Sequence, residues 1–206
     1  MTEVKREMKE KEKSMNQTKL SVSNLDLYYG NFHALKNINL ELPEKEITAF
    51  IGPSGCGKST LLKSLNRMND LIEGCRITGQ VLLDGEDITG MNITERAKAG
   101  ISFAFQQPVR FKGITVRDLI TLAAGKNLTT AEACSYLSEV GLCAQEYINR
   151  EVNASLSGGE LKRIEIAMVI ARGTKLSVFD EPEAGIDLWS FQNLIQVFER
   201  MCQNTK

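Results

Sequence analysis

The sequence predicts an α/β fold with a mostly parallel sheet, because short apolar runs typical of buried strands alternate with amphipathic helical patterns. Two such runs, residues 47–51 and 176–179, are nearly all apolar, as expected of strands that are covered on both faces. Apolar residues at helical spacing follow the first run over residues 61–68 and precede the second over residues 161–172. These four segments predict the centre of the fold.

Three further segments have the pattern of strands. Residues 20–25 and 38–42 alternate between apolar and polar side chains, and residues 80–85 form a largely apolar run that ends at an Asp-Gly turn. We therefore expect strands at these places, in the N-terminal part of the chain.

Residues 115–150 are predicted to be helical. Thr129 and Glu132 match the capping box of a helix start, and Gly141 lies where a helix is expected to end. These signals predict that more than one helix lies within residues 115–150.

The composition is that of an ordinary soluble domain, with 42% hydrophobic and 25% charged residues in a chain of 206. The net charge of −1 supplies no field that would attract nucleic acid or anionic lipid. No apolar run approaches the ~18 residues that a membrane helix needs, so any membrane role must come through a partner. The five cysteines are odd in number and form no C-x-x-C pair, which argues against disulfides and zinc and favours reduced thiols in the cytosol. They are Cys56, Cys75, Cys134, Cys143 and Cys202.

Residues 1–18 alternate acidic and basic side chains and carry almost nothing apolar. Such a segment cannot bury enough surface to offset its ordering entropy, so it is predicted to be a charged tail that is disordered or forms an exposed helix. The interleaved glutamates argue against a basic membrane anchor.

A glycine-rich loop with the pattern G-x-x-x-x-G-K-S runs from Gly52 to Ser59, between a predicted strand and a predicted helix. This context predicts a phosphate-binding P-loop, since glycines let backbone N–H groups surround phosphate oxygens and the helix directs its positive end at the same anion. Lys58 is expected to neutralise phosphate charge, and the Ser59 hydroxyl to help hold Mg²⁺. A plain glycine turn with a surface lysine is the alternative. The expected ATP contacts in the loop are Gly52, Pro53, Ser54, Gly55, Cys56, Gly57, Lys58, Ser59 and Thr60.

Two adjacent acids, Asp180 and Glu181, follow the apolar run 176–179. Ligands in open α/β sheets bind at the carboxyl ends of the strands. Asp180 fits the carboxylate that positions Mg²⁺ through water, and Glu181 fits the general base that polarises an attacking water. A solvated strand end before Pro182 is the alternative, but a P-loop upstream favours the metal and the base.

A second segment with the features of an anion site is Ser157-Gly158-Gly159-Glu160, directly before the helical pattern 161–172. It combines a serine hydroxyl, two glycine N–H groups and a helix N-terminus. The alternative is a plain Ser-Gly-Gly helix start.

The P-loop, this Ser-Gly-Gly-Glu segment and the acid pair, in this order, resemble the ABC ATPase family over about residues 20–200. The resemblance implies a P-loop NTPase core of ABC type, an N-terminal antiparallel β subdomain and a helical subdomain at about residues 108–155. It implies ATP and Mg²⁺ as cofactors and a head-to-tail homodimer. In that dimer Ser157, Gly158, Gly159 and Glu160 contact the ATP held in the P-loop of the other copy.

Three further positions match the family's motifs. Tyr29 lies 29 positions before Lys58, where the family places an aromatic residue that stacks on adenine. Gln106 resembles the glutamine that senses Mg²⁺ and the attacking water, with Gln107 as the less favoured candidate. Asp187 ends a segment similar to the loop that crosses the dimer interface.

The family continues past the acid pair with another strand and a switch histidine that contacts the γ-phosphate. This sequence ends at Lys206, and its single histidine is His33. We therefore expect an ABC ATPase domain over residues 19–206 that is incomplete at its C-terminus, lacks the final strands and hydrolyses ATP slowly.

The chain resembles two branches of the family. Residues 20–87 are similar to the ATPase of bacterial phosphate importers, whereas residues from about 93 to 200, including Lys162-Arg-Ile-Glu-Ile, are similar to the ATPase of iron–sulfur cluster assembly. The first resemblance implies an ATP-hydrolysing subunit that couples dimer closure to a membrane permease, with phosphate as substrate. Such a subunit is cytoplasmic and peripheral on the inner face of the cell membrane. The alternatives are a soluble assembly ATPase with an iron–sulfur scaffold as partner, and a nucleotide-binding module with impaired turnover. Nucleic acid is not expected as a partner.

Overall fold

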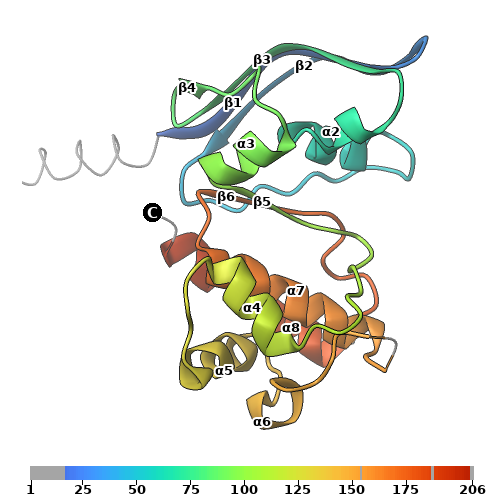
Figure 1. The fold of residues 1–206 in the computed structure, drawn as a ribbon. Helices are drawn as coiled ribbons and strands as arrows, with labels where there is room; N and C mark the ends of the chain where they lie inside the picture. Colours follow the sequence, from blue (N-terminus) through green and yellow to red (C-terminus); the bar gives the residue numbers. More distant parts are fainter. Residues whose placement is uncertain (1–16, 154, 187, 205–206) are drawn as a thin grey trace, which may run out of the picture. The chain divides into compact units, whose positions relative to one another are not determined.

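The computed structural model describes residues 17–153, 155–186 and 188–204 (Figure 1). The chain divides between Ala99 and Gly100 into two compact units. The charged tail expected over residues 1–18 lies outside the described residues except for its last two, and Thr18 already begins the first strand. No helix in the described ranges is long and apolar enough to cross a membrane.

The first unit is built on a four-stranded antiparallel sheet in the order β2-β1-β3-β4, which confirms the antiparallel β subdomain. Strands β1 (Thr18–Tyr29) and β2 (Phe32–Pro43) form a hairpin. Strands β3 (Cys75–Leu83) and β4 (Glu86–Asp87) form a second one. The predicted Asp-Gly turn joins the second pair, and Asp84 and Gly85 both have positive φ, at 51° and 81°. This is the backbone conformation that favours Asp-Gly in two-residue hairpin turns.

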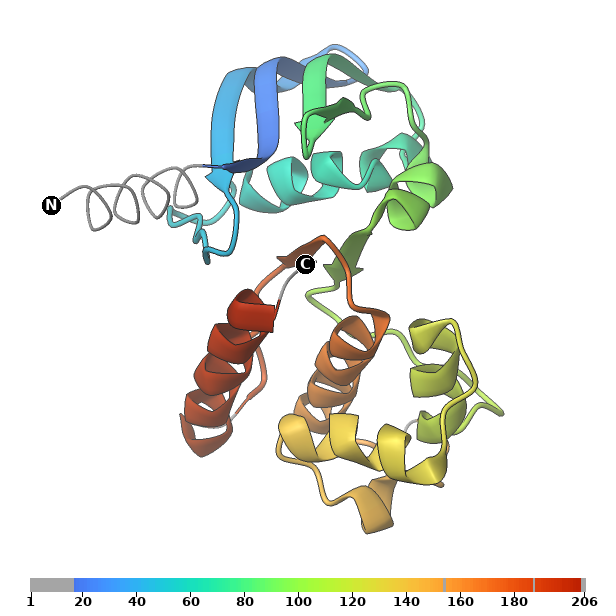
Figure 2. The same cartoon turned by 90° about the vertical axis from the view of Figure 1, so that its left-hand side faces the viewer.

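Three short helices complete the described part of the first unit. They are α2 (Lys58–Leu65), the 3₁₀ helix η1 (Met68–Leu71) and α3 (Ile93–Ala99). Figure 2 shows α2 lying along one face of the sheet. The core of the first unit is formed by buried apolar side chains, including Leu20, Leu25, Leu27, Leu65 and Val81.

The prediction of a strand over residues 47–51 is wrong. These residues have no regular secondary structure, and the side chains of Ile47 and Ile51 are 61% and 95% exposed. The physical reason is that a strand needs a neighbour for its backbone N–H and C=O groups. The described sheet of the first unit gives residues 46–53 no partner strand, so the apolar run does not become a strand.

The second unit contains a two-stranded parallel sheet of β5 (Ile101–Ala104) and β6 (Leu176–Phe179). Their register pairs Ile101 with Leu176 and Ala104 with Phe179. The strand predicted over residues 176–179 is therefore confirmed, and so is the parallel sheet of the predicted fold class.

The described part of the second unit also contains five helices. They are α4 (Val116–Ala124), α5 (Thr130–Glu139), α6 (Ala144–Tyr147), α7 (Gly158–Arg172) and α8 (Leu188–Asn204). The predicted capping box is present, because Thr129 accepts a hydrogen bond from the Glu132 N–H while the Glu132 carboxylate accepts one from the Thr129 N–H. Gly141 lies just past the end of α5 with φ 73°, as helix stops favour.

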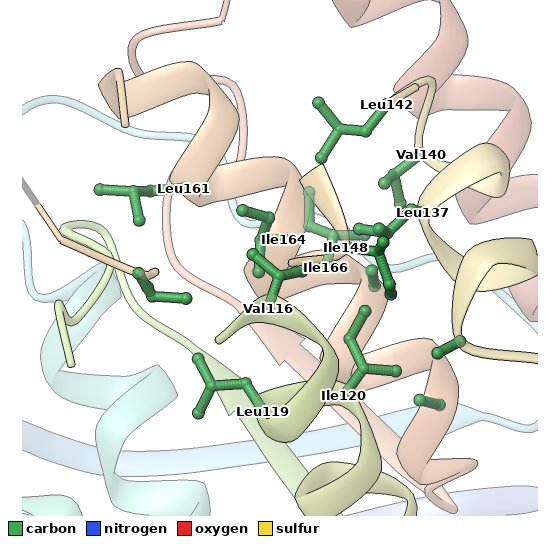
Figure 3. Close-up of a cluster of buried hydrophobic side chains, with 14 of the residues drawn as sticks. Val116, Leu119, Ile120, Leu137, Val140, Leu142, Ile148, Leu161, Ile164 and Ile166 are labelled. Atoms are coloured by element: carbon green, nitrogen blue, oxygen red, sulfur yellow. The ribbon is translucent and has the colours of Figure 1, made fainter. Parts of the chain in front are cut away.

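The core of the second unit brings the helices together around α7 (Figure 3). Side chains of α4, α5 and α7 point into one apolar cluster, and Leu194 and Val197 of α8 belong to it as well. Its fully buried members include Val116, Ile120, Leu137, Ile164 and Ile166. This cluster fixes α7, and with it the residues at either end of that helix.

Candidate ATP site

The P-loop of the first unit adopts a conformation that depends on glycine. Gly55 and Gly57 have φ values of 79° and 99°, in the left-handed region that side chains with a Cβ rarely occupy. Gly57 is the N-cap of α2, and a Cβ added to it would lie 3.2 Å from a methyl carbon of Leu35. The helix therefore begins at Lys58 without a side-chain cap, which leaves its first N–H groups and the positive end of its dipole for a ligand.

Lys58 folds back over the loop that precedes it. Its ammonium donates hydrogen bonds to the carbonyl oxygens of Gly52 and Pro53, both at 2.8 Å, and lies 3.8 Å from the Cys56 sulfur. Ser59 and Thr60 follow in the first turn of α2 and are half-buried. The loop thus gathers one positive charge and a helix N-terminus at the place where the sequence predicts phosphate.

Tyr29 is tied to the same helix through a buried amide. Its hydroxyl donates to Asn69 Oδ1 at 2.9 Å, and Asn69 Nδ2 donates to the Thr60 carbonyl oxygen at 2.9 Å. Burial raises the pKa of Tyr29, so the phenol stays protonated as a donor at neutral pH. Asn69 is fully buried and links the end of β1 to α2.

The neighbouring Tyr28 is held differently. Its ring stacks on His33 with ring centroids 4.0 Å apart, and the Arg76 guanidinium lies 4.6 Å from its centroid. Since β1 lies between β2 and β3, Tyr28 is placed between these two side chains. His33 also contacts the Asp26 carboxylate, with Nε2 and Oδ1 2.6 Å apart. Tyr29 thus remains the tyrosine directed at the P-loop helix.

In the second unit the structure brings Gln106 and Glu181 into contact. Gln106 follows β5 and Glu181 follows β6, so the parallel register places both at one edge of the sheet. Gln106 Nε2 donates to Glu181 Oε2 at 2.5 Å. Asp180 is 3% exposed, and its backbone N–H donates to the Ala104 carbonyl oxygen at 3.1 Å.

The Ser-Gly-Gly-Glu segment forms the first turn of α7. Ser157 Oγ accepts from the Glu160 N–H at 3.3 Å, and the Glu160 carboxylate accepts from the Ser157 N–H at 2.6 Å. The Tyr147 hydroxyl donates to Glu160 at 2.5 Å, and this hydrogen bond is the main cause that lowers the pKa of the Glu160 carboxyl. The segment is therefore a capped helix start with a charged, well-held Glu160.

The signature segment also touches the loop after β6. A Cβ on Gly159 would lie 3.0 Å from the Gly185 carbonyl oxygen, so the two backbones approach each other closely. The expected dimer-interface residue Asp187 lies outside the described residues. In sum, Gln106, Glu181, Asp180 and the signature segment belong to the second unit, and Tyr29 and the P-loop belong to the first.

Sequence reasoning missed two charged residues inside α7. Lys162 is fully buried and donates a hydrogen bond to the Phe105 carbonyl oxygen. Glu165 accepts one from the Phe105 N–H at 2.8 Å, and burial raises its pKa. Other charged residues, among them Arg163, lie in the same helix, so the sequence carries no signal that singles out these two charges as buried.

Comparison with known proteins agrees with the motifs. The family model described as ABC transporter matches residues 35–184. The chain is 40% identical over 187 residues to an uncharacterised ABC transporter ATP-binding protein of Methanocaldococcus jannaschii, covering 87% of this chain and 73% of that protein. It is 40% identical over 192 residues to a phosphate import ATP-binding protein of Streptococcus pneumoniae, covering 87% and 76%.

The fold is similar to that of solved ATP-binding cassettes. A dimeric cassette in a post-hydrolysis state, bound to ADP and phosphate, matches with a TM-score of 0.77 and 25% identity, over 91% of this chain and 84% of that one. The ATP-bound structure of a bacterial Atm1-family exporter matches with the same TM-score and 23% identity, over 93% of this chain and 34% of that one, and supports the fold. The family model matches residues 35–184, which are most of this chain, and two relatives are 40% identical to it. This chain therefore belongs to the ABC transporter family of ATP-binding proteins.

Proposed function

We propose that this ABC ATPase is the energy-coupling subunit of a phosphate importer. The contact between Gln106 Nε2 and Glu181 Oε2 is the observation that carries the hydrolytic part of the proposal. The importer part rests on relatives: the phosphate import ATP-binding protein of Streptococcus pneumoniae is 40% identical, and that of Corynebacterium efficiens is 38% identical over 180 residues.

In the proposed reaction the first unit binds ATP. Tyr29 stacks on adenine, the loop N–H groups and Lys58 take the phosphates, and Ser59 offers its hydroxyl to the metal. The Lys58 ammonium exchanges its two loop carbonyls for phosphate oxygens, which are stronger, charged acceptors. Residues 52–60 thereby hold the nucleotide by its charge, and Tyr29 holds it by its base.

The residues for the chemical step lie in the second unit. Glu181 acts as the general base, and the Gln106 amide orients its carboxylate and the attacking water. Ser59 of the first unit and Asp180 of the second would supply hydroxyl and carboxylate oxygens, which are donor types that Mg²⁺ prefers. When bound, Mg²⁺ neutralises charge on the β- and γ-phosphates.

A second copy of the chain completes the proposed site. Ser157, Gly158, Gly159 and Glu160 of one copy contact the γ-phosphate held by the other, and Asp187 crosses the interface. A post-hydrolysis cassette with the same fold is a dimer. Closure of this dimer around ATP then drives membrane permease subunits, which hold the chain at the inner face of the membrane.

The alternative is the ATPase of iron–sulfur cluster assembly, favoured by the resemblance of residues 93–200, which include Lys162 and Glu165. The two functions differ in their partner. Purification of the tagged chain from its native cells, separately from membranes and from the soluble fraction, is expected to recover permease subunits from membranes. Recovery of an iron–sulfur scaffold from the soluble fraction, with no permease, contradicts the importer. The Lys58→Ala chain is the control, because a permease contact does not require bound ATP.

A further inference from the structure

Lys162 and Glu165 both hold the backbone of one residue, Phe105, which lies between β5 and Gln106. Lys162 donates to the Phe105 carbonyl oxygen and Glu165 accepts from the Phe105 N–H at 2.8 Å. The two side chains also pair with each other, with Nζ and Oε2 3.6 Å apart. Phe105 is thereby bound on its donor and on its acceptor by an ion pair of α7.

The burial of this pair indicates a role that simple stability does not explain. The side chains of Lys162 and Glu165 are 0% and 13% exposed. Taking two charges out of water costs free energy that their mutual attraction often fails to recover, and an apolar pair of similar size is frequently as stable. What an apolar pair cannot do is hold a backbone N–H and C=O in one orientation.

The segment directly after Phe105 lacks regular secondary structure, and its backbone is next held at Phe111, whose N–H donates to the Val152 carbonyl oxygen at 2.9 Å. Residues 105–114 form no helix or strand, and Gln106 and Val109 are exposed. A pocket of about 140 Å³ opens beside the Phe105 ring, with Phe103, Pro108 and Met168 among its lining residues. The two polar contacts from α7 therefore hold the backbone at Phe105, directly before Gln106.

We infer that Lys162 and Glu165 are positioning residues that hold the exit of β5 so that Gln106 reaches Glu181. Gln106 Nε2 donates to Glu181 Oε2, and because Phe105 directly precedes Gln106, a shift of the Phe105 backbone would move this amide. Because Ser157 is the N-cap of α7, the same helix carries the signature segment at its start and, one to two turns later, the two side chains that hold Phe105, which we call the Phe105 clamp. The ion pair thus links the position of the signature segment to the contact between Gln106 and Glu181. This inference rests on the proposed roles of Gln106 and Glu181.

The test compares two substitutions with a matched control. Lys162→Met keeps the aliphatic stem and removes the charge and the donor. Glu165→Gln keeps an acceptor for the Phe105 N–H and removes the charge. Lys126→Met replaces an exposed lysine after α4. Steady-state phosphate release from Mg-ATP, nucleotide affinity and thermal unfolding are measured for each chain.

We expect Lys162→Met to lower kcat about ten- to a hundredfold, since small displacements of positioned groups cost rate on this scale. ATP affinity is expected to stay within about twofold, because the nucleotide-binding loop is in the first unit. Glu165→Gln is expected to keep more activity than Lys162→Met, and Lys126→Met to behave like the parent. A kcat within about twofold of the parent in both α7 variants overturns the inference.

Two further measurements separate positioning from general damage. In a Gln106→Ala chain, Lys162→Met is expected to cause less than about a twofold additional loss, because the residue that it positions is already gone. An undiminished additional loss overturns the inference. Amide hydrogen exchange of the peptide spanning residues 103–108 is expected to quicken in Lys162→Met, and unchanged exchange overturns it as well. If the parent releases no phosphate, or Glu181→Gln releases it equally fast, the proposed function fails, while hydrogen exchange still reports on the clamp.

Discussion

Arg96 of α3 stabilises the far end of the helix that follows the P-loop. Its guanidinium is 1% exposed, and it donates to the carbonyl oxygens of Ser64 at 3.1 Å and Leu65 at 2.9 Å. A third hydrogen bond reaches the Thr89 carbonyl oxygen at 3.3 Å. Burial lowers the pKa of Arg96 to about 10, so the group is still a cation at neutral pH. It therefore caps the negative end of α2.

Replacing Arg96 with Met is expected to lower the free energy of unfolding of the first unit by about 2–5 kcal/mol. A hydrogen bond from a charged donor contributes roughly 1.5–3 kcal/mol, and three carbonyl oxygens lose their partner. Removing the guanidinium also removes the free-energy cost of burying a cation, which offsets part of the stability lost with the hydrogen bonds. Arg96→Lys is expected to recover little, because an ammonium is a point charge and cannot span carbonyls on two sides as the planar guanidinium does.

Urea denaturation followed by circular dichroism measures the change, with Lys98→Met as the matched control on the same helix, where the side chain is exposed. ATP affinity is expected to fall together with stability, because the P-loop continues directly into α2. An Arg96→Met chain as stable as the Lys98→Met chain would show that water replaces the guanidinium at these carbonyls, and would refute the reasoning.

Three further outcomes concern the nucleotide site. Lys58→Ala is expected to abolish useful ATP binding, because the phosphates lose their close cationic partner in the loop; calorimetry with unchanged affinity would contradict the P-loop role. Glu181→Gln is expected to bind ATP and to hydrolyse it about 10²–10⁴-fold more slowly, the usual contribution of a general base, with the parent chain as reference for phosphate release. Cys56 is exposed and follows Gly55 in the loop, so Mg-ATP is expected to slow its reaction with maleimide; equal labelling rates with and without nucleotide would remove this thiol from the site.

The parts of the fold that the sequence predicted well are those in which one local signal is sufficient. The capping box at Thr129 and Glu132 begins α5. The Asp-Gly turn also has the expected backbone conformation. In each case the residues that give the signal also make the interaction, so no knowledge of distant neighbours is needed.

The failure at residues 47–51 has the opposite cause. The run has the composition of a buried strand, but a strand forms only where another strand supplies hydrogen bonds. Its neighbour in space cannot be deduced from its own sequence, and the described sheet of the first unit does not provide one. The composition of the segment is compatible with a strand, but without a neighbouring strand to pair with, the segment does not form one.

The residues of the candidate site likewise fall into two groups, those that the sequence predicted and those that it did not. Motif spacing identified the groups expected to touch the nucleotide, such as Lys58 and Glu181, because these residue types are required by the chemistry. It did not identify the side chains that hold the motifs in place. Those are buried polar residues, Asn69 and Arg96 in the first unit and Lys162 in the second, and a single sequence gives no indication that a polar residue is buried.

These buried polar residues share one physical property, which is that each satisfies backbone groups at the border of a motif. Asn69 binds the Thr60 carbonyl in the first turn of α2, Arg96 binds the carbonyls at its end, and Lys162 binds the Phe105 carbonyl next to Gln106. They differ in what their loss is expected to do. Removing Arg96 leaves helix-end carbonyls unpaired and lowers stability, whereas an apolar residue in place of Lys162 could fill the space and still leave the Phe105 backbone free to turn. Loss of activity in a stable chain is therefore the behaviour that distinguishes Lys162 from an ordinary core residue.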